Sequence, residues 1–481
     1  MPSQTVCDEQ LIGVAATDRR GGPWVLLALL GVSLVASGLV GEHEYASVLT
    51  VGLQAVFLMF FIRHLAFVEA AARTVQPRSA LDESGSDAEG DQLVFRSDYT
   101  PQLSVLVACH NEERVLDRLK DALRAFDYPS GLLQLIVIDD GSSDRTGELL
   151  DYWASEDSNL LALHRPAGAS GGKSGALNAA LSHVSGEVVV VFDADHRPRP
   201  DVPRRLARHF ADLGVGAVQG CCRILNGEMS LIGTLVEMDY LAGYLVNEFG
   251  RQAVFRLPAY GGANCAVRTA SLRAVGGWNE NSVTEDTDLT LRLVLTGQRI
   301  RYDVTAVDEE EAVTTLRCYW VQRYRWARGH QQVWRDYRGA VWRSSRLSLL
   351  EKIETTMFLF VFHVPVFSFL GIGLLIAGFA GLTPMGSPLD QAAAVFWTLL
   401  FLGPLLELST GLLLSGAARR KAFLLVFFLP LFFVSMVLCT KAWLDGVLDR
   451  RYSWAKTART GGPPLSESEG GPAYKSHEVL P

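Results

Sequence analysis

The chain has 481 residues, a formal net charge of -8 at pH 7 and 49% hydrophobic residues. The acidic balance argues against a nucleic-acid-binding protein, because affinity for phosphates depends on lysine and arginine. The high hydrophobic content argues against an ordinary soluble enzyme and points to membrane segments.

The hydrophobic residues are concentrated in two blocks. The first block contains two apolar runs, residues 24–40 and 46–61, and the second contains three, residues 355–380, 392–414 and 422–440. Each run is close to the roughly 20 residues that a membrane-spanning helix needs. The first run is interpreted as an anchor and not as a cleaved signal, because acidic residues precede it and a second run follows at once. The sequence therefore predicts a multi-pass membrane protein.

A polar stretch rich in Ser, Asp, Glu and Gly follows the first block and is interpreted as a linker. Beyond it, short β-branched runs at residues 103–108, 135–138 and 188–192 alternate with helical stretches at residues 113–126 and 175–183. Strands without polar alternation, separated by helices, indicate an α/β domain with a mostly parallel sheet and helices on both faces. Such a sheet binds ligands beyond the carboxyl ends of its strands.

Aspartates stand directly after two of these strands. Asp139 and Asp140 follow one strand, and Asp193 and Asp195 follow the next. Two carboxylates one residue apart can share Mg²⁺ or Mn²⁺, which would bridge the oxygens of a diphosphate and neutralise the departing nucleotide. Aspartate is also a common turn residue, so a solvated turn is the competing interpretation.

Two helix starts carry further candidates. Lys173 stands in a glycine-rich turn before a helix, where free backbone N–H groups and the helix dipole favour anions. Thr284 is placed to cap a helix whose first turn carries Glu285 and Asp286, and Asp286 is a candidate general base for an acceptor hydroxyl. Acids are common at helix N-termini for electrostatic reasons alone, which is the competing interpretation.

The stretch "VQRYRWARG", residues 321–329, concentrates arginine and aromatic side chains before the second apolar block. On a helix, Gln322, Arg325 and Trp326 share one face. Arginine can bind a diphosphate through two parallel hydrogen bonds, and a tryptophan ring offers a flat apolar surface to a sugar. The basic and aromatic residues that follow are typical of an interfacial helix on the cytoplasmic leaflet.

Taken in order, these residues resemble a known signature. Asp139 with Asp140, Asp193-Ala194-Asp195, Thr284-Glu285-Asp286 and Gln322-Arg323-Tyr324-Arg325-Trp326 resemble the D, DxD, TED and Q(Q/R)xRW motifs. This signature is found in membrane-integrated processive family 2 glycosyltransferases, such as cellulose, hyaluronan, chitin and poly-N-acetylglucosamine synthases. The resemblance covers about residues 103–329 and implies a GT-A-like domain inserted between transmembrane helices.

The resemblance also implies roles. Asp286 would be the general base, and Asp193 and Asp195 would hold Mg²⁺ or Mn²⁺. The implied nucleotide contacts are Asp139, Asp140, Lys173, Arg323 and Arg325, and the implied acceptor contacts are Glu285, Gln322 and Trp326. An inverting transfer needs such a base and cation but no enzyme nucleophile.

The implied domain order is an N-terminal tail (1–23), two transmembrane helices (24–66), a polar linker (67–100), the GT-A-like catalytic domain (101–310), amphipathic interface helices with the QxxRW motif (311–350), a C-terminal transmembrane region (351–448) and a cytoplasmic tail (449–481). In the tail, Trp454, Thr457 and Arg459 are similar to the gating loop of bacterial cellulose synthase, and an ordinary basic juxtamembrane segment is the alternative. Basic residues flank both ends of the last apolar segment, residues 422–448. We interpret it as re-entrant or as a short hairpin, the alternative being a tail on the outer side.

The resemblance implies an inverting transfer of sugar from UDP-N-acetylglucosamine or UDP-glucose, with GDP-mannose as a further option. The preferred product is a growing β-linked polysaccharide, exported through the protein's own helices from the cytoplasmic face of the plasma membrane. The alternative is a non-processive transferase, similar to ceramide glucosyltransferases, that makes a glycolipid. A nucleotide-binding transporter would leave Asp286 and Trp326 without a purpose. The predicted partners are a nucleotide sugar, a glycan or lipid acceptor and membrane lipids, with no nucleic acid.

Overall fold

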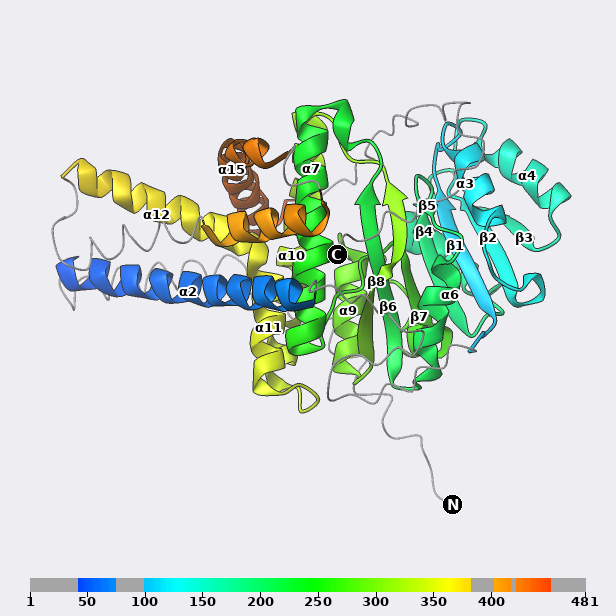
Figure 1. The fold of residues 1–481 in the computed structure, drawn as a ribbon, viewed down its shortest axis with the longest axis horizontal. Helices are drawn as coiled ribbons and strands as arrows, with labels where there is room; N and C mark the ends of the chain where they lie inside the picture. Colours follow the sequence, from blue (N-terminus) through cyan, green and yellow to red (C-terminus); the bar gives the residue numbers. More distant parts are fainter. Residues whose placement is uncertain (1–41, 75–98, 382–401, 417–420, 451–481) are drawn as a thin grey trace, which may run out of the picture.

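The computed structural model describes residues 42–74, 99–381, 402–416 and 421–450. Figure 1 shows a sheet flanked by helices on one side of the molecule and long helices that extend away from it on the other.

The centre of the domain is an eight-stranded sheet with the strand order β3-β2-β1-β4-β7-β6-β8-β5. Strands β1 to β4 are parallel to one another, β6 is parallel to β8, β7 is antiparallel to β4 and β6, and β5 is antiparallel to β8. The strands are β1 Leu103–Cys109, β2 Leu133–Asp139, β3 Leu160–His164, β4 Val188–Asp193, β5 Arg197–Pro198, β6 Val215–Ile224, β7 Cys265–Arg268 and β8 Arg299–Glu310. This mixed, mostly parallel sheet confirms the predicted GT-A-like α/β architecture.

Helices cover both faces of the sheet, as the strand composition predicted. Along β1, Leu103, Val105 and Val107 pack with α3, α4 and α6, whereas Leu106 packs with α5, α9 and α10. The helices are α3 Leu116–Arg124, α4 Thr146–Glu156, α5 Gly172–Ala180, α6 Val202–Ala207, α7 Leu231–Ala242, α8 Thr269–Ala274, α9 Glu285–Leu295 and α10 Leu316–Arg343. Because both faces are buried, the strands carry apolar residues at successive positions.

Short helical turns and π-helical segments complete the domain. The π-helical segments η4 Gly243–Glu248 and η5 Arg251–Phe255 continue the line of α7. The 3-10 turns are η1 Ser130–Leu132, η2 Arg208–Ala211, η3 Gly227–Met229 and η6 Val361–His363. The predicted helix at 175–183 begins earlier than expected, because Gly171 and Gly172 adopt positive φ angles that allow α5 to start at the glycine-rich turn itself.

The apolar helices lie beside the sheet domain. Among the described residues, three helical stretches are long and apolar enough to cross a membrane, Ala55–Arg73, Leu349–Gly373 and Ala422–Val447. They belong to α2 Glu42–Thr74, to α11 Leu349–Phe360 with α12 Val364–Phe379, and to η7 Ala422–Phe427 with α15 Phe428–Val447. In Figure 1, α2 and α12 point away from the sheet. The first predicted span, residues 24–40, lies outside the described residues.

The apolar helices differ from the predictions in two respects. Helix α2 continues through Thr74, eight residues into the predicted linker, because Phe67 and Ala71 are buried against Val246. The segment Ala422–Val447 is one continuous helical stretch, so the predicted short hairpin is wrong. Pro430 lies in the first turn of α15, where a proline needs no helical N–H partner.

Candidate active site

Asp139 ends β2 and lies almost buried at the carboxyl edge of the sheet. The Ser142 amide donates a hydrogen bond of 2.9 Å to its Oδ1, and His164 Nδ1 lies 3.2 Å from its Oδ2. Burial opposes the charged form, but these hydrogen bonds lower the pKa of Asp139 below its ordinary value. Asp139 therefore stays a carboxylate that accepts hydrogen bonds.

The next residue, Asp140, is paired with Arg165, which follows β3. Arg165 also donates to the carbonyl oxygens of Ser170, at 2.5 Å, and Gly172, at 3.3 Å. Burial raises the pKa of Asp140 although Arg165 opposes the shift. Arg165 thus connects the tip of β2 to the glycine-rich start of α5.

The DxD aspartates follow β4. Asp193 ends the strand, and Asp195 is buried in the following turn, where it accepts a hydrogen bond of 3.4 Å from the Glu311 amide. Donor atoms of Asp193, Asp195 and His196 lie within 4.8 Å of one another. The two carboxylates provide the hard oxygen ligands that Mg²⁺ and Mn²⁺ prefer, so this donor set fits the predicted cation.

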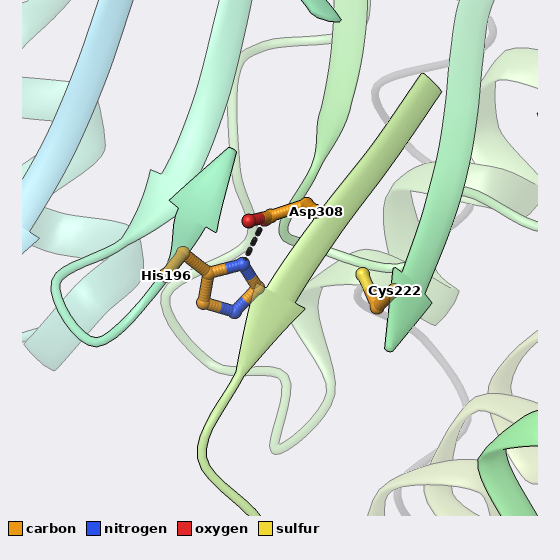
Figure 2. A group of neighbouring side chains, drawn as sticks. All are labelled: His196, Cys222 and Asp308. Carbon is orange, nitrogen blue, oxygen red and sulfur yellow. Dashed lines mark hydrogen bonds and ion pairs between the residues drawn. The ribbon is translucent and has the colours of Figure 1, made fainter. Parts of the chain in front are cut away.

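His196 is fully buried behind the DxD turn. Its Nδ1 is hydrogen-bonded to Asp308 of β8, as Figure 2 shows, and its Nε2 lies 3.1 Å from Glu310 Oε2. Burial opposes protonation, but Asp308 and Glu310 raise the pKa of His196 well above its ordinary value. His196 thus ties the DxD turn to β8 through Asp308, and its position beside Asp193 and Asp195 makes it a further candidate ligand. Cys222, its neighbour in Figure 2, remains a thiol because burial raises its pKa.

Lys173, in the first turn of α5, reaches across the site. Its Nζ lies 2.5 Å from Asp193 Oδ1 and 3.9 Å from Glu285 Oε1, and it donates a hydrogen bond of 3.0 Å to the Gly262 carbonyl. Burial opposes the charge, but Asp193 and Glu285 raise the pKa of Lys173 above its ordinary value. The ammonium group is therefore a permanent positive charge beside the DxD carboxylates.

Glu285 and Asp286 occupy the first turn of α9, as predicted, but Thr284 does not cap it through its side chain. The Thr287 amide donates a hydrogen bond of 2.5 Å to Asp286 Oδ1. Gly262 packs so closely that a Cβ added there would lie 3.1 Å from the Asp286 Cβ. Burial raises the pKa values of Glu285 and Asp286, and a more basic Asp286 is better suited to accept a proton.

Helix α10 is fixed against this region. Gln332 bonds the Asn281 carbonyl and the Val283 amide, at 3.1 and 3.2 Å. At Gly329 the helix approaches Thr284 more closely than any residue with a side chain could. The QRYRW sequence is therefore anchored directly beside the TED sequence.

The two arginines of QRYRW point to different neighbours. Arg325 lies close enough to Glu285 and Asp286 to favour their charged forms. Arg323 instead forms a 2.6 Å ion pair with Asp239 of α7, and its guanidinium stacks 4.3 Å from the Trp326 ring centroid. The predicted nucleotide contact of Arg323 stays a prediction, because its present partners lie on the α7 side.

Residues 104–272 match the protein-family profile described as Glycosyl transferase family 2. This part of the chain is a family 2 glycosyltransferase domain. The matched residues include Asp139, Asp140, Asp193 and Asp195, and they end before Thr284. The TED and QRYRW sequences are therefore observations independent of the profile match.

The chain is also similar to named relatives. The chain is 38% identical over 239 residues to beta-monoglucosyldiacylglycerol synthase of Synechocystis sp., covering 49% of each chain. It is 28% identical over 250 residues to poly-beta-1,6-N-acetyl-D-glucosamine synthase of Staphylococcus epidermidis, covering 51% of this chain and 59% of that one. The chain thus spans about half the length of the curated relatives it matches.

Among solved structures, the chain is similar to the mannosyltransferase PcManGT from Pyrobaculum calidifontis in complex with GDP-Man and Mn²⁺. The similarity has 20% sequence identity and a TM-score of 0.49, and it covers 83% of this chain and all of that one.

No sequence motif predicted the roles of some residues in the glycosyltransferase domain. Arg165 and His196 act through partners brought in from distant strands, and only the adjacency of His196 to the DxD sequence could have drawn attention to it. Gln322 is buried on α10, and its Oε1 has no hydrogen-bond partner among the described residues. The predicted gating residues Trp454, Thr457 and Arg459 lie outside the described part of the chain.

Proposed function

We propose that this protein transfers a hexose, glucose in the first place, from a nucleotide sugar to the hydroxyl of a membrane lipid and so produces a glycolipid. The observation that carries the proposal is the cluster of Asp193, Lys173, Glu285 and Asp286 directly beside α10. It combines a candidate base, a permanent positive charge and a carboxylate pair at one edge of the sheet.

The chemistry follows from these groups. Asp286 accepts the proton of the acceptor hydroxyl, whose oxygen then forms a bond to the anomeric carbon of the donor sugar. The bond between that carbon and the diphosphate oxygen breaks, and the product has the inverted configuration. Lys173, beside Asp193, and Arg325, near Asp286, would balance the charge on the diphosphate. A Mg²⁺ or Mn²⁺ ion held by Asp193 and Asp195 would supply further charge neutralisation.

The position of α10 supports an acceptor that comes from the membrane. One part of α10, including Val333, packs against the catalytic sheet. Another part, including Ala327, lies in an apolar core with α7, α15 and the helix Leu402–Leu414. The catalytic groups are thus separated from the apolar helices by a single helix. A lipid hydroxyl at the membrane surface would have a short path to Asp286.

The relatives favour a lipid over a polysaccharide as acceptor. Identity to the monoglucosyldiacylglycerol synthase is 38%, against 28% to the poly-N-acetylglucosamine synthase. The glycolipid alternative of the sequence analysis therefore replaces polysaccharide synthesis as the preferred hypothesis. Polysaccharide elongation remains the second candidate, because the QRYRW sequence and the poly-N-acetylglucosamine synthase relative favour it.

The deciding experiment uses inverted membrane vesicles that contain the protein, supplied with Mn²⁺ and radiolabelled UDP-glucose or UDP-N-acetylglucosamine. We expect label from UDP-glucose to enter the organic phase as one small species. Asp286→Asn should abolish this label, whereas Asp117→Asn, a matched change at an exposed aspartate in the first turn of α3, should not.

Other outcomes would have different meanings. High-molecular-weight aqueous label that depends on Asp286 would establish the polysaccharide hypothesis instead. Lipid label that persists in Asp286→Asn would refute the assigned base. Absence of label from either donor would contradict the proposed donors, and GDP-mannose would be the next donor to supply.

A further inference from the structure

Four charged side chains connect the apolar helices to the domain. Arg63 of α2 makes two hydrogen bonds of 2.9 Å to the carboxylate of Glu354 in α11. Arg251 of η5 donates to the same carboxylate at 3.1 Å, and it lies 3.4 Å from Glu248 of η4. We call Arg63, Glu354, Arg251 and Glu248 the charged bridge.

Three members of the bridge are buried between the helices, and the fourth, Glu248, is partly buried. Glu354 is fully buried, and the exposed fractions of Arg63 and Arg251 are 6% and 2%. Each arginine also stacks on a phenylalanine, Arg63 on Phe67 at 4.3 Å and Arg251 on Phe358 at 3.8 Å. Arg63 and Glu354 fall within candidate membrane spans, where ionisable groups are costly and usually have a function.

Glu248, at the end of the bridge away from α2, holds the loop that carries Gly262. The second carboxylate oxygen of Glu248 accepts a hydrogen bond of 2.8 Å from the Ala259 amide. The following amide, of Tyr260, donates to Thr290 Oγ1 at 3.0 Å, and that hydroxyl donates to the Asp286 carbonyl at 2.9 Å. Gly262 itself bonds Lys173 and packs against Asp286.

Stability alone does not explain such a bridge. Buried ion pairs can often be replaced by apolar side chains without loss of stability, and their best-attested use is to fix the register of packed elements. The two π-helical segments that carry Glu248 and Arg251 also indicate a functional role, because π-helical turns occur frequently at functional sites.

We propose that the charged bridge is a positioning device. Glu248 holds the loop 259–262 against Asp286 and Lys173, and the position of the loop depends on how α2 and α11 pack. The proposal rests on the proposed glycosyltransfer, because it concerns the regulation of that same site. Glu248 is a positioning residue, since it reaches the reacting groups through the loop. Lateral movement of the membrane helices would thereby change the rate of transfer.

The test compares Glu248→Ala with Glu248→Gln in the full-length protein. The glutamine retains an oxygen that can accept the Ala259 N–H, and the alanine does not. We expect Glu248→Ala to lower kcat about tenfold or more, with the affinity for UDP changed less than about twofold, and Glu248→Gln to keep most of the activity. A general loss of folding would not separate kcat from UDP affinity in this way.

Hydrogen–deuterium exchange of the peptide 257–262 gives a measurement that is independent of turnover. Glu248→Ala should increase its exchange, Glu248→Gln should not, and Glu354→Gln should increase it from the distant end of the bridge. Equal exchange in Glu248→Ala and the wild type would overturn the proposal, as would equal kcat. An unchanged loop in Glu354→Gln would refute the coupling to the membrane helices. If the wild type transfers no sugar, the proposed function fails, whereas an active wild type with a fully active Glu248→Ala refutes only the bridge.

Discussion

Gly329→Ala tests whether the contact between α10 and the TED sequence controls catalysis. A Cβ at Gly329 would lie 2.3 Å from Thr284 Cγ2, 2.4 Å from Oγ1 and 2.8 Å from Cβ. Rotation of the Thr284 side chain cannot relieve these contacts, because Cβ does not move and every staggered rotamer leaves Cγ2 or Oγ1 in one of the two close positions. Ordinary contacts begin at 3.4 Å, so an ordinary contact with the Thr284 Cβ requires the two backbones to separate by about 0.6 Å.

This separation acts on the catalytic carboxylates, because Thr284 directly precedes Glu285 and Asp286. A misplacement of about 1 Å can lower a rate roughly 100-fold, so a shift of this size should lower kcat about 10- to 100-fold. Overpacking costs roughly 1–3 kcal/mol, while alanine in a helix recovers about 1 kcal/mol relative to glycine. The free energy of unfolding should therefore fall by at most about 2 kcal/mol.

The control is Gly339→Ala on the same helix. Its Cβ would meet only the end of the flexible Arg343 side chain, at 3.2 Å. The assay measures initial rates of sugar transfer in vesicles and thermal unfolding in detergent for both variants. If Gly329→Ala were as active as Gly339→Ala, the close approach of α10 would not position the TED carboxylates, and the reasoning would be refuted.

Three further outcomes are expected. Because burial raises the pKa of Asp286, the acid limb of a pH–rate profile should lie above the ordinary aspartate value of 3.8, with the rate falling as the pH decreases through the raised pKa; a limb at or below 3.8 would contradict this. Asp195→Asn should raise the Mn²⁺ concentration for half-maximal activity at least about tenfold and weaken Mn²⁺ binding measured by electron paramagnetic resonance, since it removes one of two carboxylate ligands; unchanged binding would place the cation elsewhere. Burial lowers the pKa of His330 to about 4, so the unfolded chain binds a proton near pH 6.5 that the folded protein does not bind. The free energy of unfolding should therefore fall by at most about 3 kcal/mol as the pH decreases from 6.5 towards 4. His330→Gln should lessen this fall in thermal unfolding scans.

The sequence by itself predicted three strands of the sheet, β1, β2 and β4, and named most of the candidate residues. The strands at Asp139 and Asp193 end where their apolar runs end, and Glu285 and Asp286 begin a helix as predicted. These features depend on neighbours within a few positions. A strand that is buried on both faces has successive apolar residues, and a helix start has its own preferred residues. The α/β class could be predicted for the same reason, whereas the GT-A-like class was implied by the resemblance of the motifs.

The grouping of those residues was decided by the tertiary structure. Lys173 meets Asp193 and Glu285 only because α5, β4 and α9 converge at one edge of the sheet. Arg323 and Arg325 stand two positions apart in one motif, yet one faces α7 and the other lies near the TED carboxylates. Helical geometry predicts which side chains share a face, but it does not predict which element that face meets.

The charged bridge shows most clearly what the sequence alone does not predict. Arg63 and Glu354 are separated by 291 positions, and each stands in an apolar helical span whose sequence gives no indication of the other residue. Local sequence patterns record how a segment hydrogen-bonds and which side of it is buried. The pairing of buried charges depends on how distant helices pack, and only the folded chain brings these two groups into contact.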